Sequence, residues 1–245
     1  MTFSIVAWDP ITKMTGVAVA TKHLAVGSTV PHARSQIGSV ATQAQTNPLL
    51  AHQALDILET QKHLNIKDSL EPKHVIDMVL ATDSDRHKRQ IQIVDSHGRT
   101  AAWTGSECMN WAGHKTFQYF SVAGNILTGE KVLIDMAEAY IQSEHLPFAH
   151  RLLKSLEAAQ AAGGDCRGQQ SAALYITHHE PYPYLDLRVD HHSQPLEQLG
   201  IILAESNQDY YQSFLQAMPK SKVLNGQYSR LSSDINGRRS ISVES

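Results

Sequence analysis

The chain has 245 residues, of which 42% are hydrophobic and 18% charged, and its formal net charge is -3. This length suffices for one large domain with a sizeable core, and the charge balance lacks the basic footprint of a nucleic-acid-binding protein. No apolar run approaches the ~20 residues of a membrane helix, the first residues do not resemble a signal peptide, and the two cysteines, Cys108 and Cys166, are too few for a disulfide scaffold. We therefore expect a cytoplasmic protein without nucleic-acid or membrane partners.

The first residues alternate and are rich in β-formers, which predicts a strand over 2–8. Asp9-Pro10 indicates a turn, and a second strand over 17–21 would complete a hairpin. If Trp8 faces Val17 across this turn, Thr2 lies opposite His23, with Lys22 beside it.

Further elements follow along the chain. Strands are expected over 37–43, 89–95, 99–105, 120–127, 171–177 and 185–189. Helices are expected from Asn47-Pro48, over 72–80, over 130–162 with an interruption at Pro147 and an end at Gly163-Gly164, and over 195–215. The order of strands and helices indicates an α+β protein, with two antiparallel sheets covered by helices in an α-β-β-α sandwich. We assign residues 1–218 to one domain and expect the Ser-rich tail, 219–245, to be poorly ordered.

Thr2 opens the first strand, and a small residue after Met1 normally allows removal of the initiator Met. An exposed Thr2 would then carry both a nucleophilic hydroxyl and an α-amine. The amine has an ordinary pKa of ~7.7–8, so it can act as a base near neutral pH. A basic neighbour such as Lys22 would favour the neutral amine. Many cytosolic proteins begin with Met-Thr and have no such activity, so this feature alone is weak.

Several segments together resemble one family. They are MTFSIVAWDP (1–10), TGVAVATKHLAVGSTVPHAR (15–34), IGSVATQAQTNP (37–48), RQIQIVDSHGRTAAWTG (89–105), SVAGNIL (121–127), AAQAAGGDCRGQQSAAL (158–174) and YLDLRVDHH (184–192). In order and spacing they are similar to the family of unknown function DUF1028, with GGDCRGQQSAAL the most specific motif. The resemblance implies an N-terminal-nucleophile (Ntn) hydrolase-like fold and an amide-bond hydrolase of unknown substrate. Cys166 stands where the family often has a basic residue.

Other polar residues are candidates for the same site. Asn125, at a strand end, could donate to an oxyanion or simply form a turn. Arg167 could bind a substrate carboxylate, or pair locally with Asp165. Gln170 or Ser171 could orient the α-amine of Thr2, and Ser28, Gln43 and Gln45 could line the pocket or be ordinary loop residues.

Three functions remain open. The first is an Ntn amidohydrolase that cleaves a small linear amide without a cofactor, as a homodimer or higher homo-oligomer. The second is an inactive small-molecule binding or assembly protein that retains Met1. The third, ranked last, is a metal-assisted hydrolase built on the 14 histidines. No HExxH or CxxC spacing occurs, and adjacent histidines on a strand, such as His178-His179 and His191-His192, could not easily bind one ion because they point to opposite faces. We therefore expect most of the histidines to be surface or loop residues.

Overall fold

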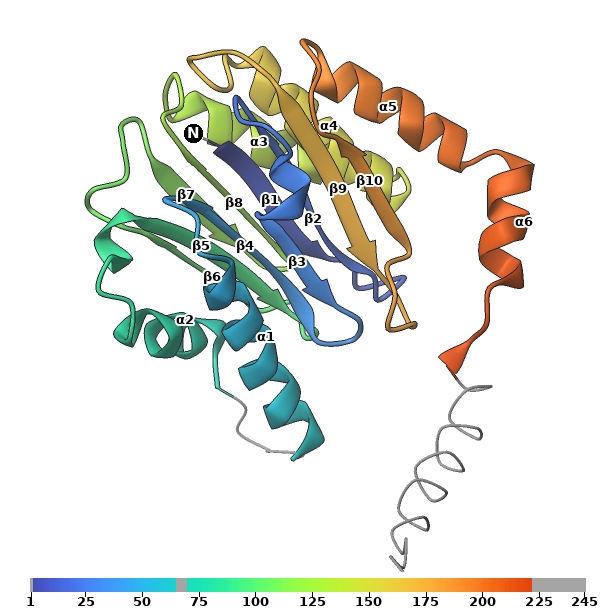
Figure 1. Cartoon of the computed structure of the whole chain (residues 1–245), viewed down its shortest axis with the longest axis horizontal. Helices are drawn as coiled ribbons and strands as arrows, with labels where there is room; N and C mark the ends of the chain where they lie inside the picture. The colour runs from blue at the N-terminus through green and yellow to red at the C-terminus, as the bar shows by residue number, and fades with distance from the viewer. Residues whose placement is uncertain (1, 65–69, 222–245) are drawn as a thin grey trace, which may run out of the picture. The chain divides into compact units, whose positions relative to one another are not determined.

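The computed structural model describes residues 2–64 and 70–221 and contains two antiparallel sheets (Figure 1). The larger sheet has six strands in the order β10 (Leu185–Val189), β9 (Ser171–Thr177), β2 (Thr15–Thr21), β1 (Thr2–Trp8), β8 (Phe120–Asn125) and β7 (Gly113–Phe117). The smaller sheet has four, in the order β3 (Pro31–Arg34), β4 (Gly38–Ala44), β5 (Arg89–Asp95) and β6 (Thr100–Thr104).

Helices cover the outer face of each sheet. In Figure 1, α1 (Pro48–His63) and α2 (Pro72–Ala81) lie against the smaller sheet, whereas α3 (Lys131–Gln142) and α4 (Phe148–Ala161) lie behind the larger one. Helix α5 (Pro195–Ser206) contacts β9, β10 and α4, and two short 3-10 helices, η1 (Val26–Ser28) and η2 (Arg86–Lys88), lie in loops. The predicted α-β-β-α sandwich of two antiparallel sheets is confirmed.

Alternate side chains along β1 face two different buried regions, one on each side of the larger sheet. Val6 and Trp8 pack in one cluster with Ala41 and Val94 of the smaller sheet, so they face the space between the sheets. Phe3 and Ile5 have the opposite parity, and they are fully buried on the face that α4 covers. Thr2 and Ser4 share the parity of Val6, so the sequence places polar side chains at one end of the inter-sheet space.

The starts and ends of several helices follow from local chemistry. The Asn47 side chain caps α1 by accepting a hydrogen bond from the Leu49 backbone N–H, with Pro48 in the first turn. Pro147 separates α3 from α4 as predicted. Gly163 and Gly164 follow α4 with φ of 113° and 47°, which is the left-handed backbone expected of such a helix end.

The structure corrects the register of the first hairpin. Trp8 pairs with Thr15 and not with Val17, so Thr2 lies opposite Thr21 and not His23. The turn is tighter than expected because the Asp9 carboxylate accepts hydrogen bonds from the backbone of Ile11 and Thr12. A slip of two residues keeps every side chain on its face, so Thr2 still points between the sheets.

Some elements differ from the sequence prediction. Strands β3 and β7 were not predicted, because β3 is short and begins with Pro, and β7 (GHKTF) carries few apolar residues. The single helix expected over 195–215 is wrong: α5 ends at Ser206, and the extended backbone of Gln208 precedes a separate helix, α6 (Asp209–Ala217).

The chain divides into two compact units between Ser206 and Asn207. The sandwich is the first, and α6 belongs to the second. Most of the predicted tail, residues 222–245, lies outside the described residues, and the domain boundary at 218 stays a prediction. Across residues 2–64 and 70–221, none of the helices has the length and apolar content needed to cross a membrane.

Candidate functional site

Thr2 lies at the start of β1, one of the two central strands of the larger sheet. It pairs with Thr21 of β2 on one side and with Asn125 of β8 on the other. Its side chain faces the space between the sheets, where its Oγ1 lies 3.2 Å from Thr21 Oγ1. The residue is only 7% exposed, so its position is fixed by strands on both sides.

Three buried amide side chains lie next to Thr2. Gln90 Oε1 accepts hydrogen bonds from Gln43 Nε2 at 2.8 Å and from Asn125 Nδ2 at 3.0 Å. The Gln90 Nε2 group donates to the carbonyl oxygens of Gly113 and Gly124 at 3.0 and 2.9 Å. Because Gln90 uses both ends of its amide, it holds Gln43 and Asn125 in fixed orientations across the two sheets.

Ser4 extends this network toward the middle of the sheets. Its hydroxyl donates to Gln43 Oε1 at 2.6 Å and accepts from Gln92 Nε2 at 2.8 Å. Gln43 Nε2 also lies 3.5 Å from the carbonyl oxygen of Thr2. The position of the Thr2 backbone is therefore connected to side chains on β4 and β5.

A pocket of about 400 Å³ adjoins this network. Its lining consists of Ala44, Gln45, Lys88, Glu107, Cys108, Met109, Asn125, Ile126 and Arg167. Two of these residues, Ala44 and Ile126, have φ of 67° and 54° and directly follow Gln43 and Asn125. Positive φ is unfavourable for residues other than glycine, above all for β-branched Ile126, and such backbone is concentrated at functional sites.

The pocket carries charged groups and one thiol. Lys88 forms an ion pair with Asp85 at 2.9 Å, and Arg167 forms one with Asp165 at 3.3 Å. Cys108 Sγ donates to the carbonyl oxygen of Arg89, and burial raises the pKa of this thiol. Cys108 is therefore protonated at neutral pH, which disfavours it as the nucleophile.

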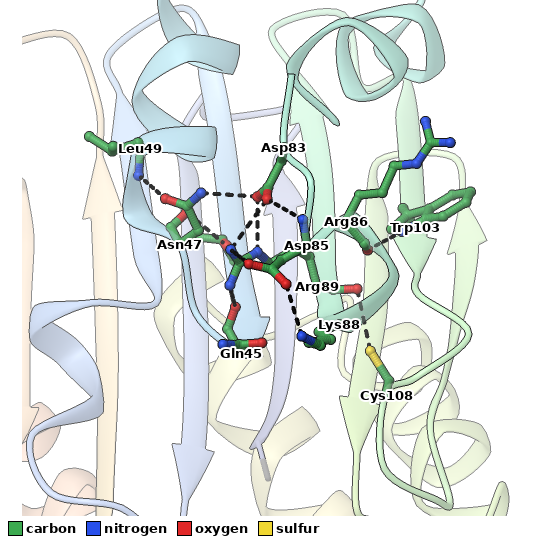
Figure 2. A network of polar contacts seen from close by, with 11 residues as sticks. Gln45, Asn47, Leu49, Asp83, Asp85, Arg86, Lys88, Arg89, Trp103 and Cys108 are labelled. Carbon is green, nitrogen blue, oxygen red and sulfur yellow. Dashed lines mark hydrogen bonds and ion pairs between the residues drawn. The ribbon is translucent and has the colours of Figure 1, made fainter. Parts of the chain in front are cut away.

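An ion-pair network supports one wall of the pocket (Figure 2). Arg89 donates to Asp83 through Nε at 2.9 Å and to the Gln45 carbonyl oxygen through Nη1 at 2.7 Å. Asn47, the cap of α1, also donates to Asp83 at 3.1 Å. The hydrogen bond from Arg89, followed by that from Asn47, lowers the pKa of Asp83 to about 2. The loop before β5, the start of α1 and Gln45 are thus held together.

Asp165 organises the loop that follows α4. Its carboxylate accepts the backbone N–H of Lys22 at 2.7 Å and that of Arg167 at 2.8 Å. The Lys22 ammonium donates to the Gln169 carbonyl oxygen at 3.0 Å. The local Asp165–Arg167 pair is present, and it leaves Arg167 on the pocket wall.

Gln170, Ser171 and Ser28 make backbone contacts in the surrounding loops. The Gln170 backbone N–H donates to the Thr21 carbonyl oxygen at 2.9 Å. Ser171 Oγ donates to the His23 carbonyl oxygen and accepts from the Val26 N–H at 3.1 Å, and Ser28 Oγ donates to the Ala25 carbonyl oxygen at 2.7 Å. The hydroxyls of Ser171 and Ser28 are therefore hydrogen-bonded to backbone groups of the neighbouring loop.

The structure thus brings together Thr2, Gln43 and Asn125, with Arg167 on the wall of the adjoining pocket. Gln90 and Gln92 were missed in the sequence. The signal was present, because in RQIQIVD the two glutamines share the parity of Val94, which faces the other sheet. A glutamine at an inward position of a buried strand indicates a polar interior.

The histidines were the basis of the metal-assisted alternative. In the described parts of the chain, no group of three or more His, Cys, Asp or Glu side chains could hold an ion. His178 and His179 lie in the loop after β9, as expected of surface or loop histidines, so the argument from opposite strand faces does not apply to them, and their rings lie 3.8 Å apart.

Comparison with known proteins identifies the family. The sequence model of a family of unknown function (DUF1028) matches residues 2–199. The chain belongs to the DUF1028 family. This DUF1028 chain is similar to the crystal structure of a DUF1028 protein from Silicibacter pomeroyi, with 33% identity, a TM-score of 0.80, and coverage of 89% of this chain and 95% of that one. It also aligns with Anbu, the ancestral beta-subunit, from Yersinia bercovieri, with 10% identity, a TM-score of 0.34, and coverage of 89% and 98%. No curated protein matches the chain.

Proposed function

We propose that this DUF1028 protein is an Ntn-type amidohydrolase in which Thr2, exposed by removal of Met1, is the nucleophile. The observation that supports this most is the position of Thr2. It begins a central strand, with its hydroxyl between the sheets, and pairs with Asn125 beside a polar pocket. A nucleophile whose own α-amine serves as base needs such a rigid strand start.

The reaction would proceed in two steps. Thr2 Oγ1 attacks the substrate amide carbonyl, and its proton passes to the α-amine of Thr2. The C–N bond then breaks, the α-ammonium gives this proton to the departing amine, and an ester remains on Thr2. Water, deprotonated by the same amine, attacks the ester and releases the carboxylic acid, which restores the Thr2 hydroxyl.

Neighbouring residues would assist these steps. One Asn125 N–H is bound to Gln90, and the amide has a second N–H that can stabilise the oxyanion. Arg167 would bind a carboxylate on a small linear substrate from the pocket wall. Gln43 contacts the Thr2 carbonyl and orients the nucleophilic residue. Lys22 would contribute positive charge near this end of β1, and two free cysteines suit a cytoplasmic location.

Intact-protein mass spectrometry with a β-lactone probe tests the proposal. We expect a chain without Met1 that gains a single adduct, and we expect Thr2→Ala to lose the adduct. An alanine at this position also permits Met1 removal, so this variant removes only the hydroxyl. Thr2→Ser should still form the adduct.

Thr15→Ala is the matched control. Thr15 is a buried threonine of the same sheet, at the end of β2 that pairs with Trp8, and its loss should leave labelling intact. Retention of Met1, or an adduct that survives in Thr2→Ala, would contradict the proposal. A chain that retains Met1 would instead favour the small-molecule binding or assembly protein, because Thr2 would then lack a free amine.

A further inference from the structure

A second pocket, of about 560 Å³, lies at the opposite end of β1 from Thr2. Trp8 is the last residue of β1, so this pocket is roughly 20 Å from the candidate nucleophile, at about 3.3 Å per residue. It is formed by the end of β1 and its turn, the β7–β8 turn, the end of α3 and the start of α4. Its volume is in the range of small-molecule sites, roughly 300–1,000 Å³.

Aromatic side chains form much of its wall. Trp8 and Tyr119 have ring centroids 5.7 Å apart, and Phe120 and Tyr140 have centroids 4.6 Å apart. Trp8 and Tyr140 are almost fully buried. Trp8 and Tyr119 belong to the cluster between the sheets, whereas Phe120 and Tyr140 contact each other on the face covered by α3. The Phe120 and Tyr140 rings favour a planar, apolar ligand.

Arg151 contributes a buried positive charge to the same pocket. Its guanidinium carbon lies 4.2 Å from the centroid of the Tyr140 ring, and its side chain is only 15% exposed. Within the residues that the structure describes, its Nε–H has no hydrogen-bond partner, and its nearest acidic atom, Asp9 Oδ1, is 3.8 Å from Nη1. That distance is too long for a hydrogen bond, so the guanidinium has N–H groups that could donate to a ligand.

Asp9 does not accept a hydrogen bond from Arg151. Its carboxylate is already engaged by the backbone of Ile11 and Thr12 and by the Thr12 hydroxyl in the β1–β2 turn. By contrast, Arg89 donates to both Asp83 and Gln45. A buried donor without a partner is unfavourable, and a ligand oxygen would relieve it.

Apart from Asp9, which is also buried but whose carboxylate is bound within its own turn, the charges at this end are more exposed. Lys13 Nζ lies 4.8 Å from the centroid of the Trp8 ring, and Glu144 and His145 lie at the rim. The cation that is buried within the aromatic wall is therefore the one that selects the ligand's charge.

From the aromatic rings beside it and from the guanidinium of Arg151, whose Nε–H has no hydrogen-bond partner among the described residues, we propose that this pocket binds a small planar aromatic carboxylate. The ligand ring lies against Phe120 and Tyr140, and its carboxylate accepts hydrogen bonds from Arg151. This site is separate from Thr2 and does not depend on the proposed hydrolase activity.

Isothermal titration calorimetry of the full chain with 2-naphthoate tests the site, with 2-naphthalenemethanol as the uncharged probe. We expect saturable 2-naphthoate binding at one site. Arg151→Met should weaken it about tenfold or more, because it removes charge-assisted hydrogen bonds. The same substitution should change binding of the alcohol less than about threefold. Thr2→Ala should bind 2-naphthoate like the wild type.

Two substitutions of opposite charge at Ile11 provide a second test in case Arg151→Met fails to fold. Ile11 lines the pocket yet is 85% exposed, so it tolerates substitution. Ile11→Lys should strengthen 2-naphthoate binding and Ile11→Glu should weaken it, and added salt should reduce both effects. No binding up to about 1 mM, equal affinity in folded Arg151→Met, identical affinities in the two Ile11 variants, or loss of binding in Thr2→Ala would overturn the proposal.

Discussion

Gln90 connects the polar side chains that surround Thr2. It accepts from Gln43 and Asn125 and donates to two backbone carbonyls of the larger sheet. Gln43 and Asn125 are buried, so loss of Gln90 leaves each of them without this hydrogen bond. Single side chains therefore affect both the geometry of the candidate site and the stability of the fold.

Asn125 offers a direct test of oxyanion stabilisation. Asn125→Ala removes the N–H groups next to Thr2, and we expect β-lactone labelling to slow roughly 100-fold, as for loss of an oxyanion donor. Labelling rates are measured by mass spectrometry at several probe concentrations. Asn125→Asp, which keeps the shape but not the donor, serves as the comparison. A rate within about twofold of wild type in both variants would exclude this function for Asn125.

His32 should make stability depend on mildly acidic pH. Burial, and then the charge of nearby His52, lower the pKa of His32 from 6.5 to about 4. The unfolded chain therefore binds a proton below pH 6.5 that the folded chain binds only near pH 4, so stability falls as pH falls through this window and levels off below it. Between pH 6.5 and 4, urea unfolding should show that the free energy of unfolding falls by about 2–3 kcal/mol. This decrease should be absent in His32→Leu. Parallel pH profiles for the two proteins would contradict this.

At the scale of elements, hydrogen bonds between loops set the position of the pocket walls. Asp83, after α2, binds Arg89 at the start of β5 and Asn47 at the start of α1 (Figure 2). Arg89 in turn holds the carbonyl of Gln45 on the pocket. The start of α1, the loop after α2 and the start of β5 are thereby fixed at one end of β4 and β5, the two inner strands of the smaller sheet.

Asp83→Asn should test this connection. The pKa of Asp83 is lowered to about 2, so its stabilising effect is present above the unfolded value of 3.8 and is lost as pH falls through about 2. We expect the variant to lose about 1–2 kcal/mol of unfolding free energy at pH 7. It should match the wild type in an acid titration near pH 2. A difference between the two proteins that is constant with pH would argue against the ion pair.

At the scale of the whole sandwich, the space between the sheets has two chemically different parts. Val6, Val17, Val19 and Val94 belong to an apolar cluster. The amide network and Thr2 form a polar part at the start of β1. Stability and reactivity should therefore respond to different substitutions.

Val6→Ala and Gln90→Ala compare a substitution in the apolar cluster with one in the polar network. Val6→Ala should cost about 2 kcal/mol through lost burial and a cavity, yet leave β-lactone labelling unchanged. Gln90→Ala should slow labelling by about tenfold or more, because Gln43 and Asn125 lose their common partner. Thermal unfolding and labelling are measured on the same samples. Equal labelling rates in the two variants would show that the polar part does not support reactivity.

The sequence determined much of the architecture, because local patterns carry it. Alternation identified β1, β5 and β9, and Asn47-Pro48, Pro147 and Gly163-Gly164 marked helix boundaries. These signals act over a few residues, so the helices and strands they mark can be predicted before the tertiary structure is known. The segments that carried the family resemblance were also visible in the sequence, and the family match confirms them.

Only the tertiary structure decided the pairing and the composition of the site. Thr2 lies opposite Thr21, not His23, because the Asp9 turn set a register that alternation leaves open by two residues. Gln90 contacts Asn125 and Gln43, which are 35 and 47 residues away in sequence. The Nε–H of Arg151, which has no hydrogen-bond partner among the described residues, is likewise a property of packing. Such contacts depend on how two sheets stack, and no local pattern specifies that.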